Sequence, residues 1–473
     1  MPRRHFHKIP RKIQRKRPAE ERVKDFHPVY HEFEDKEALD QALRCITCPI
    51  DLLRDFPNKD FPFCRTGCPL TNKIPQWIKA LKHGDLKTAF ELSNETSPFP
   101  EIMGRICPHD NLCQGSCTIH KTPHGSVTIG ALEVYISEKG FEEGFKPYYG
   151  EDKEKKGKVA VIGAGPAGLS CATFLLREGV NVDIYDKHDR PGGLLMYGIP
   201  NFKLPKDRIL RRVKWMEEAG AKFILNHPVL TEKEFEEIVD NYDAVFIGVG
   251  APSGRGAGIP NEEAKGVYHV MDVLIHAQKR VFKDFDDCFL RGKKVVVLGG
   301  GDSAMDAVRT SVRSGAKEVY CVYRRDEANM PGSKKEVENA KEEGVKFIFY
   351  AAPKEIKVNE NNEVVGIVCN KTELTEPDER GRRRVRVVEG SEFEIDCDII
   401  IFALGFDNVK FPWYEHAGIE TDKWGCPVVN DKFQTTNEKV FAGGDAIRGA
   451  DLVVTAVRDG REAAKAIAKM IRG

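Results

Sequence analysis

Short apolar runs separated by glycine-rich turns dominate the chain from Lys158 onward. Runs such as VVVL (295–298) and IIIFAL (399–404) have the length of buried strands, and helical patterns follow several of them. Strands that alternate with helices in this way predict an α/β fold with parallel sheets. Residues 1–150 differ, because they are rich in Cys, Pro and His and carry short helical patterns such as 74–92.

Two segments of the α/β part resemble each other. Residues 158–187 and 293–325 each have the order strand, glycine loop, helix, strand. This order is typical of the first half of a dinucleotide-binding fold. The sequence therefore predicts two nucleotide-binding folds in one chain.

The first glycine loop lies between an apolar strand and a helix. Its residues are Gly163, Ala164, Gly165, Pro166, Ala167 and Gly168. The next strand ends in Asp186, 23 residues after Gly163. In this fingerprint the glycines allow a tight turn and bring a pyrophosphate to a helix N-terminus, while the acid accepts hydrogen bonds from a ribose. The loop alone leaves FAD and NAD open.

The C-terminal segment favours FAD for this first fold. Residues 435–464 contain a strand that leads to Gly443, Gly444 and Asp445 and then to a helix. This resembles the second FAD motif of flavoproteins with two dinucleotide domains. The resemblance implies that Asp445 hydrogen-bonds the ribityl–phosphate region of FAD. It also implies that the positive end of the following helix points at the flavin.

The second glycine loop is followed by a different residue type at the strand end. Its residues are Gly299, Gly300, Gly301, Asp302, Ser303 and Ala304, which fit G-x-G-x-x-A. The next strand ends in Arg324 and Arg325 rather than in an acid. An arginine fork suits the 2′-phosphate of NADPH, whereas an acid suits the 2′-hydroxyl of NADH. The pair predicts NADPH here, and a solvated strand end is the alternative.

Seven of the 13 cysteines cluster near the N-terminus. They are Cys45, Cys48, Cys64, Cys68, Cys107, Cys113 and Cys117. Their spacings and Cys-Pro pairs resemble the ferredoxin pattern C-x2-C-x2-C-x3-C-P, and such thiolates suit iron–sulfur clusters or zinc. Seven ligands, one short of eight, suggest two four-ligand sites. We favour iron–sulfur clusters over structural zinc and unligated thiols, and we expect His109, His120 and His124 to be ordinary surface or loop histidines.

Charge and hydropathy exclude several classes of function. The 73 Lys and Arg balance the 73 Asp and Glu, so a nucleic-acid binder is not expected. No apolar run approaches the roughly 18 residues of a membrane helix. A long chain without an apolar signal segment, in which the cysteines cluster, is expected in the cytoplasm. The first 18 residues carry eight Lys and Arg and no acid, which fits a flexible tail, a docking arm for an acidic partner, or a targeting segment.

From about residue 40 onward the chain resembles the small subunit of bacterial glutamate synthase, an NADPH-oxidising iron–sulfur flavoprotein. The matching runs are GRICPHDNLCQGSCT, VTIGALEVYI, GGLLMYGIPNFKLPKDRI, GGGDSAMDAVRTSVRSGA, YRRDEANMPGSKKEVENAKEEGV and FAGGDAIRGADLVVTA. The N-terminal half of dihydropyrimidine dehydrogenase and the flavoprotein subunit of bifurcating ferredoxin:NADP oxidoreductase are related to it. The resemblance implies two Rossmann-like domains, with the NADPH domain inserted in the FAD domain, after an α-helical iron–sulfur domain. The expected domains are residues 1–150, residues 151–250 together with 402–473, and residues 251–401.

The resemblance also implies which residues hold the cofactors. One 4Fe–4S cluster would take Cys45, Cys48, Cys64 and Cys117, and a second would take Cys68, Cys107, Cys113 and Glu133. The cofactor-binding residues would be Gly163, Gly165, Pro166, Ala167, Gly168, Asp186, Gly193, Leu194, Lys203, Gly299, Gly301, Asp302, Ser303, Ala304, Arg324, Arg325, Gly444, Asp445 and Thr455. The chain departs from the family in one place, because fifteen residues separate Cys48 from Cys64 where relatives have only a few.

The implied activity is electron transfer. A hydride would pass from NADPH to FAD, and electrons would then pass singly through two clusters to a partner, so no catalytic acid or base is needed. The expected partner in a hetero-oligomer is the glutamate synthase large subunit, which makes glutamate from glutamine and 2-oxoglutarate. The alternatives are a ferredoxin:NAD(P) oxidoreductase subunit and a stand-alone NAD(P)H-dependent electron-transfer flavoprotein. A flavin disulfide reductase is disfavoured because Cys171 has no neighbouring cysteine, and intact glycine loops disfavour a non-catalytic scaffold.

Overall fold

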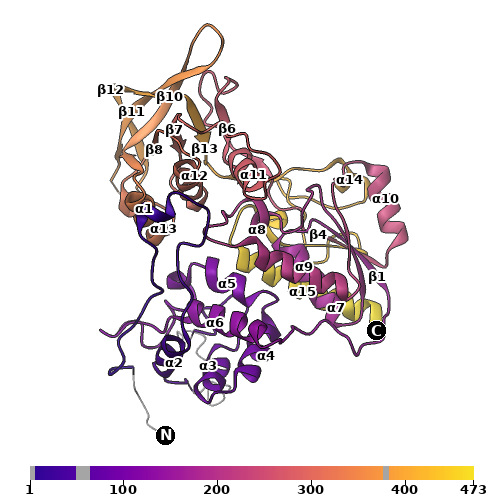
Figure 1. The fold of residues 1–473 in the computed structure, drawn as a ribbon. Coiled ribbons are helices and arrows are strands. Elements are labelled where there is room, and N and C mark those ends of the chain that lie inside the picture. Colours follow the sequence, from indigo (N-terminus) through magenta and orange to yellow (C-terminus); the bar gives the residue numbers. More distant parts are fainter. Residues whose placement is uncertain (1–5, 49–63, 377–382) are drawn as a thin grey trace.

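The computed structural model describes residues 6–48, 64–376 and 383–473. Its elements form a helical unit near the N-terminus and two bodies, each built around a parallel sheet (Figure 1). The predicted class, an α/β protein with a mostly helical start, is confirmed. Within the described ranges, no helix combines the length and apolar character needed to cross a membrane.

The helical unit consists of short helices joined by the loops that carry the clustered cysteines. Its helices are α2 (Asp35–Leu43), α3 (Ile74–Lys82), α4 (Leu86–Thr96), α5 (Pro100–Ile106) and α6 (Ile129–Glu142). Pro75 and Pro100 lie in the first turn of their helices, where a backbone N–H has no intrahelical partner to lose. Trp77 and Leu132 are fully buried in the core of this unit.

The first sheet contains strands from both halves of the chain. Its order is β15 (Val440–Ala442), β4 (Ala244–Ile247), β1 (Lys158–Ile162), β2 (Asn181–Tyr185) and β3 (Lys222–Ile224), and all neighbours are parallel. Helices α7 (Pro166–Arg177) and α15 (Val453–Arg472) pack together against this sheet. The chain leaves this sheet after β4 and returns to it only at β15.

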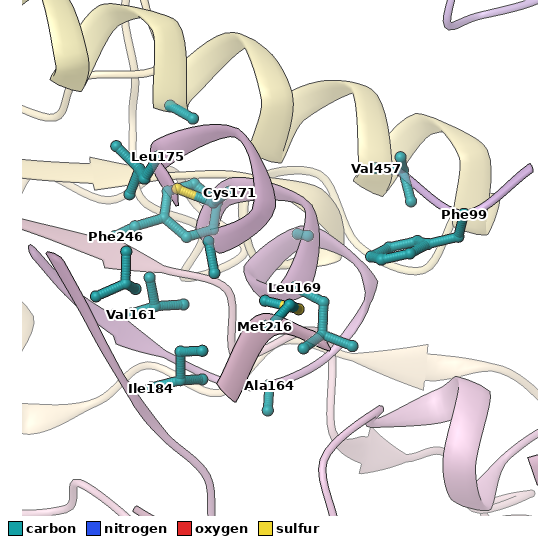
Figure 2. Packing of buried hydrophobic residues seen from close by; sticks show 14 of the residues in the cluster. Phe99, Val161, Ala164, Leu169, Cys171, Leu175, Ile184, Met216, Phe246 and Val457 are labelled. Carbon is teal, nitrogen blue, oxygen red and sulfur yellow. The ribbon is translucent and has the colours of Figure 1, made fainter. Parts of the chain in front are cut away.

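The core between the first sheet and helix α7 is shown in Figure 2. Val161, Ile184 and Phe246 extend from the sheet toward Leu175 and Cys171 of α7. Cys171 is fully buried, and burial raises the pKa of its thiol well above the usual value. The thiol therefore serves as a small core side chain rather than as a reactive group.

The second sheet has the same parallel arrangement. Its order is β6 (Val267–His269), β13 (Ile399–Phe402), β7 (Lys294–Leu298), β8 (Glu318–Tyr323) and β9 (Lys346–Phe349). Its helices are α11 (Val270–Val281), α12 (Asp302–Arg313) and α13 (Lys334–Glu342). An antiparallel sheet of β10 (Ala351–Val358), β11 (Val364–Leu374) and β12 (Val385–Asp396) projects at the top of Figure 1.

The two crossings between the bodies lie side by side. β5 (Ser253–Gly254), just after the first sheet, pairs with β14 (Phe406–Asp407), just before the return. Arg255 and Asp407 form an ion pair at the same place, with 2.5 Å between Nη2 and Oδ1. The domain boundaries expected at 250/251 and 401/402 lie just before β5 and at the last residue of β13.

Four more helices belong to the first body. They are α8 (Leu194–Tyr197), α9 (Lys206–Glu218), α10 (Glu232–Asn241) and α14 (Pro412–His416).

The basic N-terminal segment packs against the rest of the protein. The short helix α1 (Ala19–Arg22) follows it directly, and Arg22 is only 1% exposed. Backbone hydrogen bonds join residues 15–17 to residues 29–31. A flexible tail, one of the three expectations for the first 18 residues, is therefore wrong for residues 15–17, which these hydrogen bonds hold.

A buried ion pair joins the helical unit to the first body. Arg212 of α9 donates from Nε and Nη2 to the two oxygens of Glu101, at 2.7 and 2.6 Å. A third hydrogen bond runs from Nη2 to Oδ1 of Asn94 at 2.9 Å. Both charged side chains are at most 1% exposed, so each depends on the other for compensation.

Replacement of Glu101 by Leu should destabilise the protein by about 3–5 kcal/mol, because it leaves the Arg212 guanidinium buried without a counter-ion. Glu95→Gln is the matched control, since Glu95 is half exposed beside Lys73 and its loss should cost at most about 1 kcal/mol. Urea unfolding of both variants measures the difference. Equal midpoints would contradict the buried pair.

Candidate cofactor and metal sites

The first glycine loop connects β1 to α7, and its geometry explains each glycine. Gly163 has a φ of +103°, and a Cβ there would lie 2.4 Å from the carbonyl oxygen of Gly248. A Cβ on Gly168 would lie 1.8 Å from the carbonyl oxygen of Gly163, so helix and strand touch here. At Gly165 the nearest atom is 4.0 Å away, which leaves space for a ligand. Asp186 accepts a hydrogen bond from the N–H of Ala164 at 2.7 Å and so fixes the turn.

The second glycine loop connects β7 to α12 in the same way. Gly299 has a φ of +145°, and a Cβ there would lie 2.3 Å from the carbonyl oxygen of Ala403. Gly301 would meet nothing within 4 Å, and Ala304 is fully buried at the close contact of helix and strand. The free N–H groups at the start of α12 can therefore receive a phosphate.

Arg324 and Arg325 follow β8, at the edge of the second sheet where the second glycine loop also lies. Within the described part of the chain neither Arg324 nor Arg325 has an ion-pair partner, and Nε of Arg325 is buried without a hydrogen bond. The backbone of the pair is fixed, because Thr372 donates from Oγ1 to the carbonyl of Arg324 at 2.9 Å and Tyr350 N donates to the carbonyl of Arg325 at 3.1 Å. Two uncompensated guanidinium groups on a fixed backbone form a site for an anion.

Asp445 follows the last strand of the first sheet. Its Oδ1 atom is buried and has no hydrogen-bond partner among the described residues. Burial raises the pKa of Asp445 to about 7. A buried oxygen without a donor is costly, so the carboxyl group fits a ligand that brings hydroxyl donors.

One cavity of about 1380 Å³ joins these features. Drug-sized ligand pockets measure roughly 300–1,000 Å³, so this cavity has room for more than one such ligand. Fourteen of the expected cofactor-binding residues line it, namely Gly163, Gly165, Pro166, Ala167, Asp186, Gly193, Leu194, Gly299, Gly301, Asp302, Ser303, Arg324, Arg325 and Asp445.

The other five expected positions lie beside the cavity rather than on its wall. Gly168 and Ala304 pack a helix against a strand, and Gly444 N donates to Asp459 Oδ2 at 3.0 Å. Lys203 donates from Nζ to Oδ1 of Asp306 on α12 at 2.7 Å. Thr455 donates from Oγ1 to Oδ2 of Asp451 at 2.9 Å. These residues support the walls of the cavity.

Four of the clustered cysteines meet in the helical unit. Cys45, Cys48, Cys64 and Cys117 line one small cavity, with apolar side chains such as Ile78 around them. Burial raises the pKa of the Cys45, Cys48 and Cys64 thiols, and the neighbouring thiols add to the rise at Cys64. The fifteen residues between Cys48 and Cys64 lie outside the described residues.

The other three cysteines each feel the charge of one carboxyl group, that of Glu133. Burial raises the pKa of the Cys68, Cys107 and Cys113 thiols, and Glu133 contributes further to each rise. Burial also raises the pKa of Glu133 itself to about 8. Among the described residues, no three His, Cys, Asp or Glu side chains converge closely enough to hold one metal ion. Cys45, Cys48, Cys64 and Cys117 share one small cavity, and the division of the eight residues into two ligand sets stays a prediction from the resemblance.

The three nearby histidines differ in their surroundings. His120 and His124 are exposed, as expected. His109 is a loop histidine whose Nε2 atom is buried and unpaired within the described residues, and burial lowers its pKa to about 4. Its ring packs against Gly130 at the start of α6, where a Cβ would lie 2.4 Å from it.

Comparison with known proteins assigns the chain to a family. The model for pyridine nucleotide-disulphide oxidoreductases matches residues 157–460, and the model for dihydropyrimidine dehydrogenase domain II, 4Fe-4S cluster, matches residues 22–145. The glutamate synthase (NADPH) small chain of Escherichia coli K12 is 45% identical over 461 residues, which cover 96% of this chain and 95% of that protein. The chain belongs to the glutamate synthase small-chain family. It is thus an oxidoreductase with a 4Fe–4S domain.

Other relatives extend this assignment. Oxidoreductase AegA of E. coli K12 is 47% identical over 95% of this chain and 68% of its own length. Two solved structures share the fold. Mycobacterium tuberculosis FprA in complex with NADPH has a TM-score of 0.55 at 21% identity, over 67% of this chain and 84% of its own. Lactococcus lactis thioredoxin reductase has a TM-score of 0.51 at 23% identity, over 67% of this chain and 99% of its own.

The sequence did not point to several residues of this glutamate synthase small-chain homologue that hold the expected cofactor and cluster ligands in place. Asn72 donates from Nδ2 to Oε1 of Glu133 at 3.0 Å. Arg461 of α15 donates to the carbonyl of Leu70, two residues after Cys68, at 2.8 Å. Asp459, also on α15, is fully buried. Charged residues on the apolar face of α15 were the available signal, since buried charges occur almost only with partners.

The pKa of Asp445 leads to a pH prediction for protein freed of FAD. The unfolded carboxyl group ionises near its usual 3.8, whereas the folded one keeps its proton to about 7. The folded state therefore binds more protons in this interval, and the free energy of unfolding should fall as pH rises from about 4 to about 7. Asp445→Asn should lose less stability over the same interval. Urea unfolding at about pH 5 and about pH 7.5 measures this, and equal losses would rule out Asp445 as the cause.

Proposed function

We propose that the protein takes a hydride from NADPH onto FAD and passes the electrons, through two 4Fe–4S clusters, to a partner protein. The single cavity that joins both glycine loops carries this proposal. Hydride transfer requires the two cofactors to meet, and a shared cavity permits this. FAD accepts electrons in pairs and releases them singly, and this is the chemistry that the bound cofactors supply.

The first body would hold FAD. Gly163 and Gly165 open the turn for the pyrophosphate, and the N-terminus of α7 supplies the positive end of a helix. Asp445 offers a buried acceptor, Oδ1, that receives no hydrogen bond from the residues that the structure describes. These are the residues that the resemblance to the glutamate synthase small chain implies for FAD binding.

The second body would hold NADPH. Gly299 and Gly301 form the corresponding loop, and Arg324 and Arg325 lie at the end of the neighbouring strand. Free guanidinium groups support a 2′-phosphate rather than a 2′-hydroxyl at this place. The names of the glutamate synthase (NADPH) relatives support the same preference.

The thiol sets would hold the clusters in a defined order. Leu70 and Met103 belong to the core of the first body, and Cys68 and Cys107 pack against that core. Cys45, Cys64 and Cys117 pack in the core of the helical unit and not against the core of the first body, whereas Cys68 packs against both cores. The contacts of Cys68 and Cys107 with the first body support an order in which the set with Glu133 would be nearer FAD and the set with Cys45 nearer the partner.

The glutamate synthase large subunit is the proposed partner in a hetero-oligomer. The small chains of E. coli and Azospirillum brasilense, at 45% and 42% identity, support this choice because each is matched over nearly its whole length. A second candidate is an acceptor such as ferredoxin, or a stand-alone electron-transfer role. The 47% identity to oxidoreductase AegA, which is longer than this chain, favours it.

Anaerobic purification and titration test the proposal as a whole. We expect about one FAD and about eight iron atoms per chain, and flavin bleaching by NADPH at lower concentration than by NADH. Glutamate formation with an added large subunit then tests the partner. Zinc without sulfide would exclude the clusters, and NADH preference would exclude the role of the arginine pair.

Removal of the arginine pair should change cofactor preference. Arg324→Ala with Arg325→Ala should raise KM for NADPH about 10- to 100-fold, because charge-assisted hydrogen bonds to a phosphate contribute about 1.5–3 kcal/mol. KM for NADH should stay within about twofold, since NADH lacks that phosphate. Arg386→Gln, at an exposed pair with Glu373, is the control. Equal losses for both nucleotides would contradict the assignment.

Serine substitutions should separate the two thiol sets. Cys117→Ser should leave about four iron atoms, in the set with Glu133, and NADPH should still reduce that remaining cluster. Cys68→Ser should also leave about four, but NADPH should no longer reduce them, because the cluster nearer FAD is lost. Low-temperature EPR after NADPH addition distinguishes the variants. Cys288→Ser, at a cysteine outside both sets, is the control, and the opposite pattern would reverse the order.

A further inference from the structure

The N-terminal residues 15–31, called the strap below, form a closed hairpin. Arg17 N donates to the carbonyl of Val29, and His31 N donates to the carbonyl of Arg15, both at 2.9 Å. The Arg17 guanidinium closes the hairpin with two hydrogen bonds to Asp25, at 2.9 and 2.6 Å. The strap therefore has a structure of its own, apart from its contacts with the sheet bodies.

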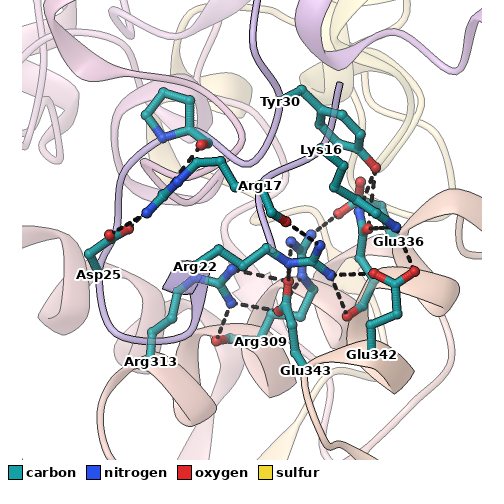
Figure 3. Close-up of polar contacts among 12 residues, drawn as sticks. Lys16, Arg17, Arg22, Asp25, Tyr30, Arg309, Arg313, Glu336, Glu342 and Glu343 are labelled. Atoms are coloured by element: carbon teal, nitrogen blue, oxygen red, sulfur yellow. Dashed lines mark hydrogen bonds and ion pairs between the residues drawn. The ribbon is translucent and has the colours of Figure 1, made fainter. Parts of the chain in front are cut away.

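Arg22 of the strap enters a buried charge network on the second body (Figure 3). It donates from Nε to Glu343 and from Nη2 to Glu342, both at 2.7 Å. Arg309 and Arg313 of α12 also bond to Glu343, at 2.8 and 2.6 Å. Although burial opposes ionisation, the hydrogen bonds from Arg313 and Arg309 lower the pKa of Glu343 to about 2. One carboxylate thus joins the strap to the C-terminal end of α13 and to α12.

Other strap side chains bind the same helix. Lys16 donates from Nζ to Glu342 at 2.6 Å, and the Tyr30 hydroxyl lies 3.2 Å from Oδ1 of Asn339. The ammonium group of Lys335 lies 3.6 Å from the centre of the Tyr30 ring. The strap therefore contacts α13 from its first turn to its last.

Both helices that the strap network holds, α12 and α13, have their N-terminal ends at the second glycine loop. α12 starts at Asp302, within the loop, and α13 starts directly after a segment that closes on it. In that segment Gly332 N donates to the carbonyl of Gly300 at 3.0 Å, and Ser333 N donates to Asp302 Oδ1 at 2.9 Å. Pro331 of the same segment lines the large cavity.

The opposite side of the strap binds the first body. Val29 N donates to the carbonyl of Phe202 at 3.0 Å, and Asn201 donates from Nδ2 to the carbonyl of Phe26 at 2.9 Å. The guanidinium of Arg313 lies 4.0 Å from the centre of the Phe202 ring. The strap thus lies between the two bodies and contacts both.

We propose that the strap positions the second glycine loop for NADPH, and that Arg22 is the positioning residue. This inference rests on the proposed NADPH site, which Arg22 does not itself contact. Arg22 acts through α12 and α13, whose starts form the loop and its cover. Without Arg22, Glu343 keeps two arginines, but the strap loses its buried anchor and is held on α13 only by the contacts of Lys16 and Tyr30.

The test compares two charge-removing variants of the holoenzyme. Arg22→Gln removes the buried anchor. Lys24→Gln removes an exposed charge two positions after Arg22, at a side chain without a polar partner among the described residues. Anaerobic stopped-flow gives the Kd for NADPH and the rate of flavin bleaching, and hydrogen exchange reports on residues 329–342.

For Arg22→Gln we expect Kd for NADPH to rise about three- to tenfold and exchange in residues 329–342 to accelerate. FAD content, iron content and bleaching by dithionite should equal those of the parent protein, because these depend on the other two units. Lys24→Gln should match the parent in every measurement. A merely stabilising role would lower the unfolding midpoint and leave Kd for NADPH unchanged, which would overturn the inference.

A milder variant decides the question if Arg22→Gln does not fold. Tyr30→Phe removes only the hydroxyl that contacts Asn339 and should change Kd and exchange in the same direction by a smaller factor; no change in either would overturn the inference. Failure of the proposed function is recognised separately, because the parent protein would then not be bleached by NADPH. Exchange in residues 329–342 would still test the effect of the strap on the loop.

Discussion

The arrangement of the whole chain follows from one geometric requirement, that two helix N-termini at the ends of two parallel sheets reach the same cavity. Parallel strands carry their ligand-binding loops at the carboxyl edge, so each sheet has only one edge to offer. The chain satisfies this requirement by inserting the second body between β4 and β15 of the first. The paired crossings β5 and β14 then hold the two edges toward each other, and Gly165 and Gly301 line the same cavity.

Buried charges fix the contacts between the three units. Arg212 and Glu101 join the helical unit to the first body, and Lys203 and Asp306 join the first body to α12. An arrangement that displaced either pair would leave a charge buried and uncompensated, at a cost of about 3–5 kcal/mol. Apolar contact alone tolerates sliding, whereas such pairs require one alignment. The same requirement explains why side chains that touch no cofactor can still determine where the glycine loops lie.

The fold and the two glycine loops could be predicted from the sequence because their signals are local. Strand, glycine turn and helix follow one another within about thirty residues, and each glycine has a steric reason to be there. Glu133 has no local signal and was identified only through the family resemblance. The anchor of the strap could not be predicted, because Arg22 and Glu343 are 321 positions apart and neither belongs to a motif. Composition described residues 1–18 as basic, and one of these residues, Lys16, pairs with Glu342 of the same chain.

The burial of the two thiol sets affects both the protonation of the thiols and the order in which the proposed clusters would pass electrons. Three thiols and Glu133 lie in surroundings that raise the pKa of each group, so as free acids they would remain largely protonated near neutral pH. An iron–sulfur cluster needs thiolates, and its positive iron centres compensate the charge that burial disfavours. Cys68 and Cys107 of this set pack against the core beneath the first glycine loop, so a cluster held there would have a short path to FAD bound at that loop as proposed. Cys45, Cys64 and Cys117 of the other set do not pack against that core, and a cluster held there would be the one available to an acceptor outside the chain.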